Sequence, residues 1–251
     1  MPRFYIEPRQ SQNALLPLSE KESHHAVDVL RVRRGERVVA LDGQGCELLC
    51  EVQELAPRAV TLRVVQKNLI PALSCQLTLL QAIPKGKTMD SIVQKATELG
   101  AHRIVPLLSE RTVTQLESET AAHKVEKWLG TAIEAIKQCD SAWLPRIDVP
   151  ITLPAFLAGG ERAELSLVAS LQDGARHPRH YFQTFFQEHQ HLPASIAVWV
   201  GPEGDFTPAE MNAIRSAGAL PISLGPLVLR SETAALYCLS VLNYELQAPP
   251  R

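Results

Sequence analysis

The stretch Ser195-Ile-Ala-Val-Trp-Val-Gly-Pro-Glu-Gly-Asp205 decides the fold of this chain, because an apolar strand runs directly into a tight Gly/Pro loop. A second strand ends in a similar loop, Leu224-Gly-Pro-Leu-Val-Leu-Arg230, and Ser231 then opens the last helix. In an open α/β sheet, ligands bind beyond the carboxyl ends of the strands, where such loops converge. The loops carry one obvious cation, Arg230, which favours a small polar cofactor over a polyphosphate.

Strand and helix alternate from Ser74 onward, which predicts an α/β sheet with parallel strands. Strands are predicted at 76–82, 102–108 and 165–170. Apolar residues at helical spacing and a stop at Gly100 predict a helix over 89–99. A long amphipathic helix is predicted over 118–138, and a capped helix from Thr207 to Gly218. The segments 145–164 and 177–191 give no clear prediction.

Residues 1–70 have a different pattern, with short strands predicted at 37–41, 45–52 and 59–65. Ser19-x-x-Glu22 reads as a capping box, which predicts a helix that runs to about Leu30. Asp42-Gly43 is typical of a hairpin turn between two of the strands. The pattern favours a small β-barrel followed by a linker over 67–73. We therefore expect two domains, residues 1–70 and residues 71–251.

The bulk properties of the 251-residue chain, 45% hydrophobic and 21% charged, are typical of a soluble globular protein. No apolar run is long enough to span a membrane, and the start lacks the apolar core of a signal peptide. The five cysteines are odd in number and indicate reduced thiols of a cytoplasmic protein. Cys46-x3-Cys50 has no matching second pair, so we expect no metal site.

The net charge of −2 does not indicate a nucleic-acid partner, so polyanion binding would need a local basic surface. The candidates for such a surface are Arg31, Arg33, Arg34 and Arg37, supported by Arg3 and Arg9, with a second group at Lys85 and Lys87. From the residues alone, a basic RNA-binding patch and an ordinary solvated charged face are about equally compatible with this pattern.

The glycines exclude two common classes of enzyme. Gly201-Pro-Glu-Gly-Asp205 matches neither the dinucleotide-binding pattern G-x-G-x-x-G nor a P-loop. Hydride transfer and ATP hydrolysis are therefore disfavoured. Either loop taken singly could also be an ordinary strand-to-helix turn.

Taken together, the two loops are more specific. Gly-Pro-Glu-Gly-Asp-Phe-Thr-x-x-Glu at 201–210 and Leu-Gly-Pro-x-x-Leu-Arg-Ser-Glu-Thr-Ala at 224–234 resemble the C-terminal signature of the SPOUT methyltransferases. More narrowly, they are similar to the ribosomal small subunit methyltransferase E family. Met89–Gly100 and the His24–Arg31 segment agree, and the resemblance covers nearly the whole chain.

The resemblance implies a PUA-like β-barrel that engages rRNA, followed by a SPOUT α/β domain with a C-terminal deep trefoil knot. It also implies S-adenosylmethionine as cofactor, methylation of uridine N3 in 16S rRNA of the small ribosomal subunit, and a homodimer. The cofactor-binding residues that it implies are Leu171, Gly201, Pro202, Glu203, Gly204, Leu224, Gly225 and Leu229. Arg230 would lie where the base and the methyl group meet, and Glu232 and Thr233 would orient it. Glu232 is also a possible general base, or simply a helix-start carboxylate.

Two segments depart from the family pattern. Gly204-Asp205 stands where the family usually reads Gly-Gly, so Asp205 is either a carboxylate near the site or an outward-facing loop residue. Lys137–Ser141 stands where Glu-Gln-Ser-x-Arg is common, so we assign that segment no RNA or subunit contact. The alternatives are a SPOUT ribose 2′-O-methyltransferase of rRNA or tRNA, a non-catalytic rRNA-binding assembly factor, and an ordinary nucleotide-dependent α/β enzyme.

Overall fold

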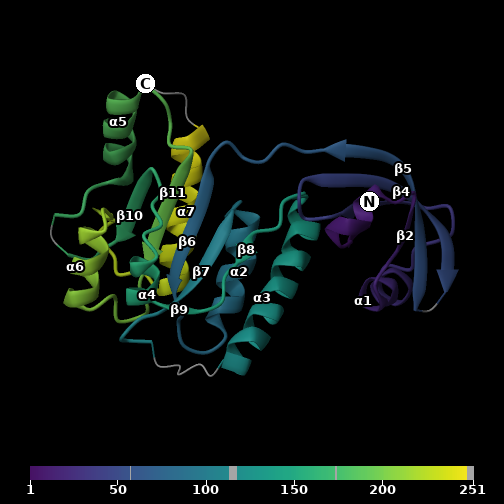
Figure 1. Cartoon of the computed structure of the whole chain (residues 1–251), viewed down its shortest axis with the longest axis horizontal. Coiled ribbons are helices and arrows are strands. Elements are labelled where there is room, and N and C mark those ends of the chain that lie inside the picture. Colours follow the sequence, from purple (N-terminus) through teal and green to yellow (C-terminus); the bar gives the residue numbers. More distant parts are fainter. Residues whose placement is uncertain (57, 113–117, 173, 248–251) are drawn as a thin grey trace. The chain divides into compact units, whose positions relative to one another are not determined.

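A computed structural model describes residues 1–56, 58–112, 118–172 and 174–247, and the chain forms two compact units (Figure 1). The first unit comprises Met1–Ala72 together with Ile133–Leu144. The second comprises Leu73–Ala132 and Pro145–Arg251. The long helix α3 (Ser118–Cys139) thus contributes its last residues to the first unit.

The first unit is a five-stranded sheet with the strand order β1-β3-β4-β5-β2. Phe4 of β1 and Leu16 of β2, the two edge strands, belong to one buried core with Leu48 and Leu62, so the sheet curves around that core. Its elements are β1 (Arg3–Tyr5), the 3-10 helix η1 (Pro8–Gln12), β2 (Leu15–Pro17), α1 (Glu20–His24), the π-helix η2 (His25–Val29), β3 (Arg37–Leu41), β4 (Cys46–Ala56) and β5 (Ala59–Leu69).

The hairpin predicted at Asp42-Gly43 is present between β3 and β4. The Asp42 carboxylate accepts hydrogen bonds from the amides of Gln44 (2.8 Å) and Cys46 (2.9 Å), and Gly43 has a φ of +73°. A left-handed φ of this kind favours glycine, which explains the turn. The linker prediction was wrong for residues 67–69, which continue β5 and pair with β4.

The predicted capping box at Ser19 forms only in part. The Ser19 hydroxyl accepts the amide of Glu22 (3.2 Å), as expected. The Glu22 carboxylate, however, does not return to Ser19 but accepts from Nζ of Lys137 (2.9 Å). Both side chains are buried, so an ion pair between Glu22 and Lys137 of α3 replaces the expected hydrogen bond from the Ser19 amide to Glu22. Lys137, which differs from the residue common in the family, therefore has a structural partner, Glu22, within the first unit.

The second unit is an α/β structure around a parallel sheet with the strand order β12-β10-β11-β6-β7-β8, in which β9 also pairs with β7. The predicted strands and helices of this region are present. Helices and strands also occupy the two segments that gave no clear prediction. Besides α3, the elements are β6 (Gln76–Ala82), α2 (Thr88–Glu98), β7 (Arg103–Leu108), β8 (Arg146–Ile147), β9 (Ile151–Thr152), α4 (Leu153–Ala158), β10 (Leu165–Ala169), α5 (Pro178–His189), β11 (Ser195–Val200), α6 (Pro208–Ser216), β12 (Leu220–Ile222) and α7 (Ser231–Gln247).

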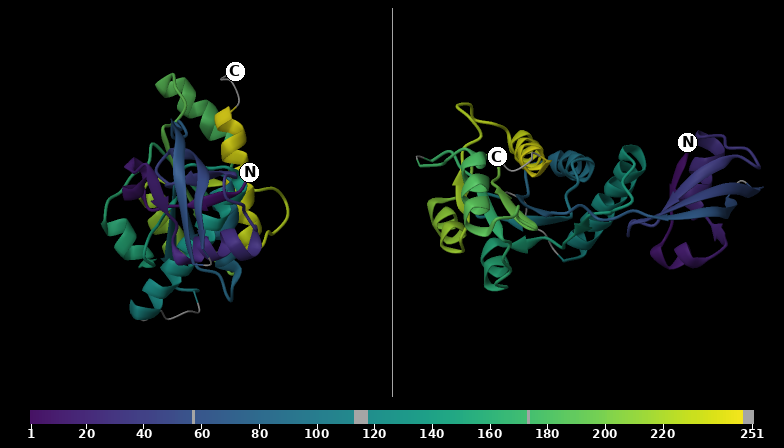
Figure 2. Two further views of the ribbon diagram at one scale, coloured as in Figure 1. Left: turned by 90° about the vertical axis from the view of Figure 1, so that its right-hand side faces the viewer. Right: turned by 90° about the horizontal axis from the view of Figure 1, so that it is seen from above.

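Helices cover both faces of this sheet, α2 and α7 on one side and α4 and α6 on the other (Figure 2). Successive side chains of β6 point to opposite faces of the sheet. Leu80 packs in the core with Ile214 of α6, whereas Gln81 contacts Ser231 of α7. Among the described helices, none is long and apolar enough to cross a membrane.

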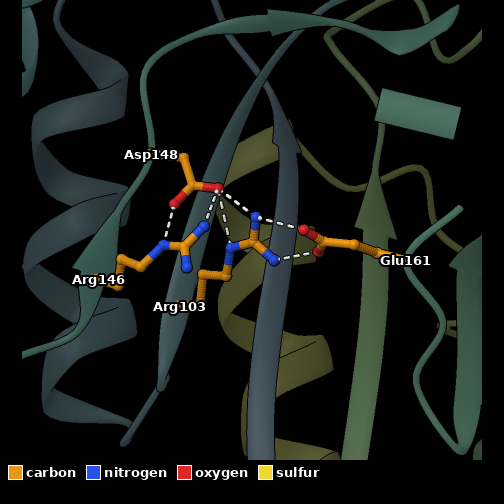
Figure 3. Close-up of polar contacts among 4 residues, drawn as sticks. All are labelled: Arg103, Arg146, Asp148 and Glu161. Carbon is orange, nitrogen blue, oxygen red and sulfur yellow. Dashed lines mark hydrogen bonds and ion pairs between the residues drawn. The ribbon is translucent and has the colours of Figure 1, made fainter. Parts of the chain in front are cut away.

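An ion-pair cluster joins β7 to the segments around β8 and before β10 (Figure 3). Arg103 lies between the carboxylates of Asp148 and Glu161 and binds both, with a distance of 2.9 Å from its Nε to Asp148. Nε of Arg146 binds the other oxygen of Asp148 at 2.7 Å. Burial alone would raise the pKa of Asp148, but the hydrogen bonds from Arg146 and Arg103 outweigh it, and the pKa lies below its ordinary value.

Acid should therefore weaken this cluster. Because the folded-state pKa of Asp148 is lowered, its contribution to stability is fully present above the unfolded-state pKa of about 4 and is lost as the pH falls below that value. We expect the difference in unfolding free energy between the wild type and Asp148→Asn to be constant near neutral pH and to shrink below about pH 4. Urea unfolding at a series of pH values measures it. A difference that stays constant down to the lowest pH would contradict the assignment.

Candidate functional site

A cavity of about 420 Å³ lies at the carboxyl ends of β10, β11 and β12. Strand β11 pairs with one side of β10 and β12 with the other, so the chain reverses its direction of travel across the sheet at this point. Such a switch point leaves a crevice between the loops and is where open α/β sheets bind ligands. The described lining residues come from three loops and the start of α7: Ala169–Gln172, Gly174 and Ala175; Val200–Glu203 and Asp205; Ser223–Leu229; and Ser231 and Ala234.

A second cavity of about 500 Å³ lies over the first residues of β6, β10, β11 and β12, at Gln76, Leu165, Ser195 and Leu220. Its charged and polar groups largely satisfy each other: Arg103 binds Glu161, and Glu164 accepts the amide of Ala194. Because it lies at the amino ends of the strands, we take the first cavity as the functional site.

Most residues predicted to bind a cofactor line the first cavity. They are Leu171, Gly201, Pro202, Glu203, Leu224, Gly225 and Leu229. Gly204 is not among the lining residues; its carbonyl accepts a hydrogen bond from Arg111. The Glu203 carboxylate accepts the amide of Lys85 (2.9 Å) and so ties the loop after β11 to the loop after β6.

The loop 201–206 is closed tightly on itself. A Cβ atom at Gly201 would lie 2.9 Å from Oδ1 of Asp205 and 3.1 Å from the amide nitrogen of Phe206, so a larger residue would have to displace part of this loop. Oδ1 of Asp205 accepts the amide of Phe206 (2.8 Å). Asp205 lines the cavity, so of the two readings of this residue the structure supports a carboxylate at the site. Burial raises the pKa of this carboxyl, opposed by the Phe206 amide and the nearby Arg111.

A buried hydrogen-bond chain fixes the start of α7 beneath this loop. The amide nitrogen of Gln81, in β6, donates to the Ser231 hydroxyl (2.9 Å), which donates to the carbonyl of Gly201 (2.7 Å). Both side chains are buried. Sequence reasoning missed this role, although a glutamine inside an otherwise apolar buried strand was a visible signal. It also missed Arg111, for which we find no signal in the sequence.

Arg230 immediately follows the cavity-lining loop and precedes α7. It is exposed, and among the described contacts its guanidinium has no hydrogen bond or ion pair, so it is available to a substrate. Glu232 lies in the first turn of α7. The described contacts do not join Glu232 or Thr233 to Arg230, so the prediction that they orient it finds no support in the geometry.

The predicted basic residues fall into two groups. Arg31, Arg33, Arg34 and Arg37 are exposed on the segment leading into β3, and Lys85 and Lys87 are exposed before α2. Arg3 instead pairs with Asp140, and Arg9 pairs with Glu7 at 2.6 Å. These two arginines are already engaged within the first unit. Among the described residues, no group of three or more His, Cys, Asp or Glu side chains is placed to hold a metal ion.

Two family models match the chain. The model of an RNA methyltransferase domain matches residues 71–243, and that of an RNA methyltransferase PUA domain matches residues 18–65. Among curated proteins, the chain is 30% identical to ribosomal RNA small subunit methyltransferase E of Bacillus subtilis, over 98% of each chain. It is 32% identical to the protein of that name from Synechocystis, over 98% of this chain and 78% of that protein.

Solved structures agree with these matches. A putative methyltransferase from Legionella pneumophila, in complex with the bound cofactor SAM, superposes with a TM-score of 0.85 at 31% identity, over 96% of each chain. A ribosomal RNA small subunit methyltransferase E from Neisseria gonorrhoeae, bound to S-adenosyl methionine, has a TM-score of 0.83 at 26% identity, over 97% of each chain.

Proposed function

Because this chain belongs to the family of ribosomal RNA small subunit methyltransferase E, we propose that it methylates N3 of a uridine in 16S rRNA with S-adenosylmethionine as donor. The observation that carries the proposal is the cavity at the switch point of the sheet, with Arg230 immediately after its lining loop. The same cavity would serve a ribose 2′-O-methyltransferase, so the test below separates the two reactions.

The cavity fits the cofactor in size and charge. Its volume of about 420 Å³ lies within the usual range for small-molecule sites. The apolar side chains of Leu171, Leu224 and Leu229 would enclose the adenine ring, and the backbone at Gly201 and Gly225 would bind polar edges. The described lining residues include two carboxylates and no cation, which suits a positively charged ligand and not a polyphosphate. When bound, S-adenosylmethionine supplies an electrophilic methyl group.

Gly201→Ala is expected to weaken cofactor binding by about tenfold or more, because the added methyl group crowds the Asp205 carboxylate and the Phe206 amide and so shifts the loop that lines the cavity. Titration calorimetry with S-adenosylmethionine measures the change. Gly130→Ala is the matched control, since a Cβ at that position in α3 meets nothing within 4 Å. Equal affinities for the wild type and Gly201→Ala would show that this loop does not hold the cofactor.

Arg230 is the residue that we propose acts on the base. Uracil N3 becomes a good nucleophile only after it loses its proton, and the resulting charge spreads onto O2 and O4. A cation beside those oxygens stabilises the charge as it develops. The guanidinium of Arg230 serves this role and cannot serve as the base, because arginine stays protonated. Glu232, in the first turn of α7, is the candidate proton acceptor.

The exposed arginines of the first unit provide the RNA contact. We propose residues 1–70 as a PUA-like RNA-binding domain and residues 71–251 as the methyltransferase domain, of which Ile133–Leu144 pack in the same unit as residues 1–70. Arg31, Arg33, Arg34 and Arg37 would contact phosphates and set the register, with Lys85 and Lys87 as a second group of contacts. Arg3 and Arg9 are weaker candidates because each already has an acidic partner. N3 is accessible only in an unpaired or flipped base, so the RNA must be held while the base is displaced.

The C-terminal segment supports a knotted fold and a homodimer. From β12 the chain continues to α7, which begins against Gly201 and Gln81, and we propose that this segment forms the deep trefoil knot that the family resemblance implies. Leu227, Val228, Tyr237 and Tyr244 are exposed in the preceding loop and on α7. Exposed apolar side chains on one segment indicate an interface, which a second copy of the chain would cover. Sedimentation of the purified chain tests the dimer.

The test uses small ribosomal subunits from cells that lack this gene. Purified protein and labelled S-adenosylmethionine are added, the rRNA is digested, and the labelled nucleoside is identified by mass spectrometry. Label in N3-methyluridine supports the proposal, and label in a ribose-methylated nucleoside assigns the chain to the neighbouring SPOUT reaction. No label, despite bound cofactor, would point to a non-catalytic rRNA-binding protein.

The basic surface of the chain is modest, so the folded rRNA must supply much of the recognition. We therefore expect assembled cytoplasmic subunits to react better than free 16S rRNA.

A further inference from the structure

The charges around the cavity are unusually one-sided. Among the described lining residues the charged side chains are Glu203 and Asp205, and both are acidic. Glu203 is exposed and binds the amide of Lys85, so solvent and that contact weaken its field. Asp205 is half-buried and held in place by the Phe206 amide, with its φ at +60°. Of the two, Asp205 therefore presents the less screened and better fixed negative charge.

The ligands of a methyltransferase differ in charge at one atom. S-adenosylmethionine carries a sulfonium cation, and the product S-adenosylhomocysteine has a neutral thioether in its place. Apolar contacts and backbone hydrogen bonds around the adenine and ribose do not distinguish the two molecules. A fixed carboxylate in the cavity does, because it attracts the sulfonium of the donor but not the neutral thioether of the product, while the α-ammonium group is common to both.

We propose that Asp205 is a specificity residue that favours the cationic donor over the neutral product and so limits product inhibition. The inference rests on the proposed function, since it assumes that this cavity holds the methyl donor. The poor hydration of the carboxylate agrees with it: burial raises the pKa of Asp205, and a carboxylate that has lost water gains more from a nearby cation. The positive charge of Arg111, which donates a hydrogen bond to the Gly204 carbonyl, lies near Asp205 and opposes this rise in pKa. It therefore partly offsets the negative charge that Asp205 presents to a ligand, although Arg111 is not among the described residues that line the cavity.

Asp205→Asn removes the charge and keeps the shape. Asparagine tolerates a left-handed φ and can accept the Phe206 amide through its own oxygen. Titration calorimetry of the full chain is carried out with S-adenosylmethionine, S-adenosylhomocysteine and sinefungin, which carries an ammonium group near the position of the sulfonium. We expect Asp205→Asn to weaken binding of the two cationic ligands by about tenfold and that of S-adenosylhomocysteine by less than about twofold. Glu188→Gln, an exposed change on α5, is the charge-matched control.

The outcomes separate the inference from the function on which it rests. Equal weakening of all three ligands would show that Asp205 only shapes the loop, and no change in any of them would show that its charge is not felt. Either result overturns the inference while leaving the cofactor assignment intact. If the wild type binds none of the three, the proposed function fails, and the inference fails with it.

Discussion

Arg230→Ala is expected to lower the rate of methyl transfer by about two to three orders of magnitude, as removal of a single oxyanion-stabilising group does in other enzymes. The side chain is exposed next to the cavity, and the described contacts give it no partner, so its loss removes charge from the reaction without disturbing packing. Cofactor affinity should change by less than about threefold, because Arg230 is not among the lining residues. Single-turnover rates on small subunits, with calorimetry for the cofactor, measure both quantities.

Arg230→Lys is the informative companion variant. Lysine retains the positive charge but loses the planar fork of donors, so partial activity would indicate that charge matters more than bidentate geometry. A near-normal single-turnover rate for Arg230→Ala would remove Arg230 from the chemical step. A parallel loss of cofactor affinity would instead assign it to binding.

Lys137→Met is expected to destabilise the first unit by about 3 kcal/mol or more, since it leaves the buried carboxylate of Glu22 without its cation. Both side chains are less than one-tenth exposed, and Nζ of Lys137 lies 2.9 Å from Glu22. The methionine fills a similar volume, so loss of packing contributes little. Hydrogen exchange of β4 and β5, compared with β6 and β11 of the second unit, localises the effect.

The double variant Glu22→Gln with Lys137→Met tests the physical cause. Removing both charges should restore much of the lost stability, because an uncompensated buried charge costs more than an absent ion pair. If the double variant is as unstable as Lys137→Met alone, packing around α3 and not the charge on Glu22 accounts for the loss.

The strands and helices of the second unit could be predicted because their local signals agree with the fold. The capping box at Thr207 forms in full, with Glu210 accepting the Thr207 amide at 2.9 Å. The capping box at Ser19 has an equally clear pattern and forms only in part. The difference lies in tertiary context, since Lys137 offers Glu22 a stronger partner from a point 115 residues away. A local sequence motif contains no information about a partner that is so distant in the sequence.

The residues of the candidate site also fall into those that could be predicted from local sequence and those that could not. Gly201, Leu224 and their neighbours were found because Gly/Pro loops after strands leave a local pattern. Gln81 and Arg111 were missed because their roles depend on contacts with Ser231 and Gly204, 150 and 93 residues away. The strand order that brings the loops after β10 and β12 together is likewise a property of the assembled sheet.

The chain of hydrogen bonds from Gln81 through Ser231 to Gly201 also sets the time at which the site can form. It joins β6, near the start of the second unit, to the first residue of the last helix, so loop closure over most of the unit precedes it. A nascent chain that has emerged only as far as Ile222 contains β6, β10, β11 and β12 but lacks the third loop and the support beneath Gly201. The ability to hold the methyl donor thus arises at the end of synthesis, when the last helix is in place.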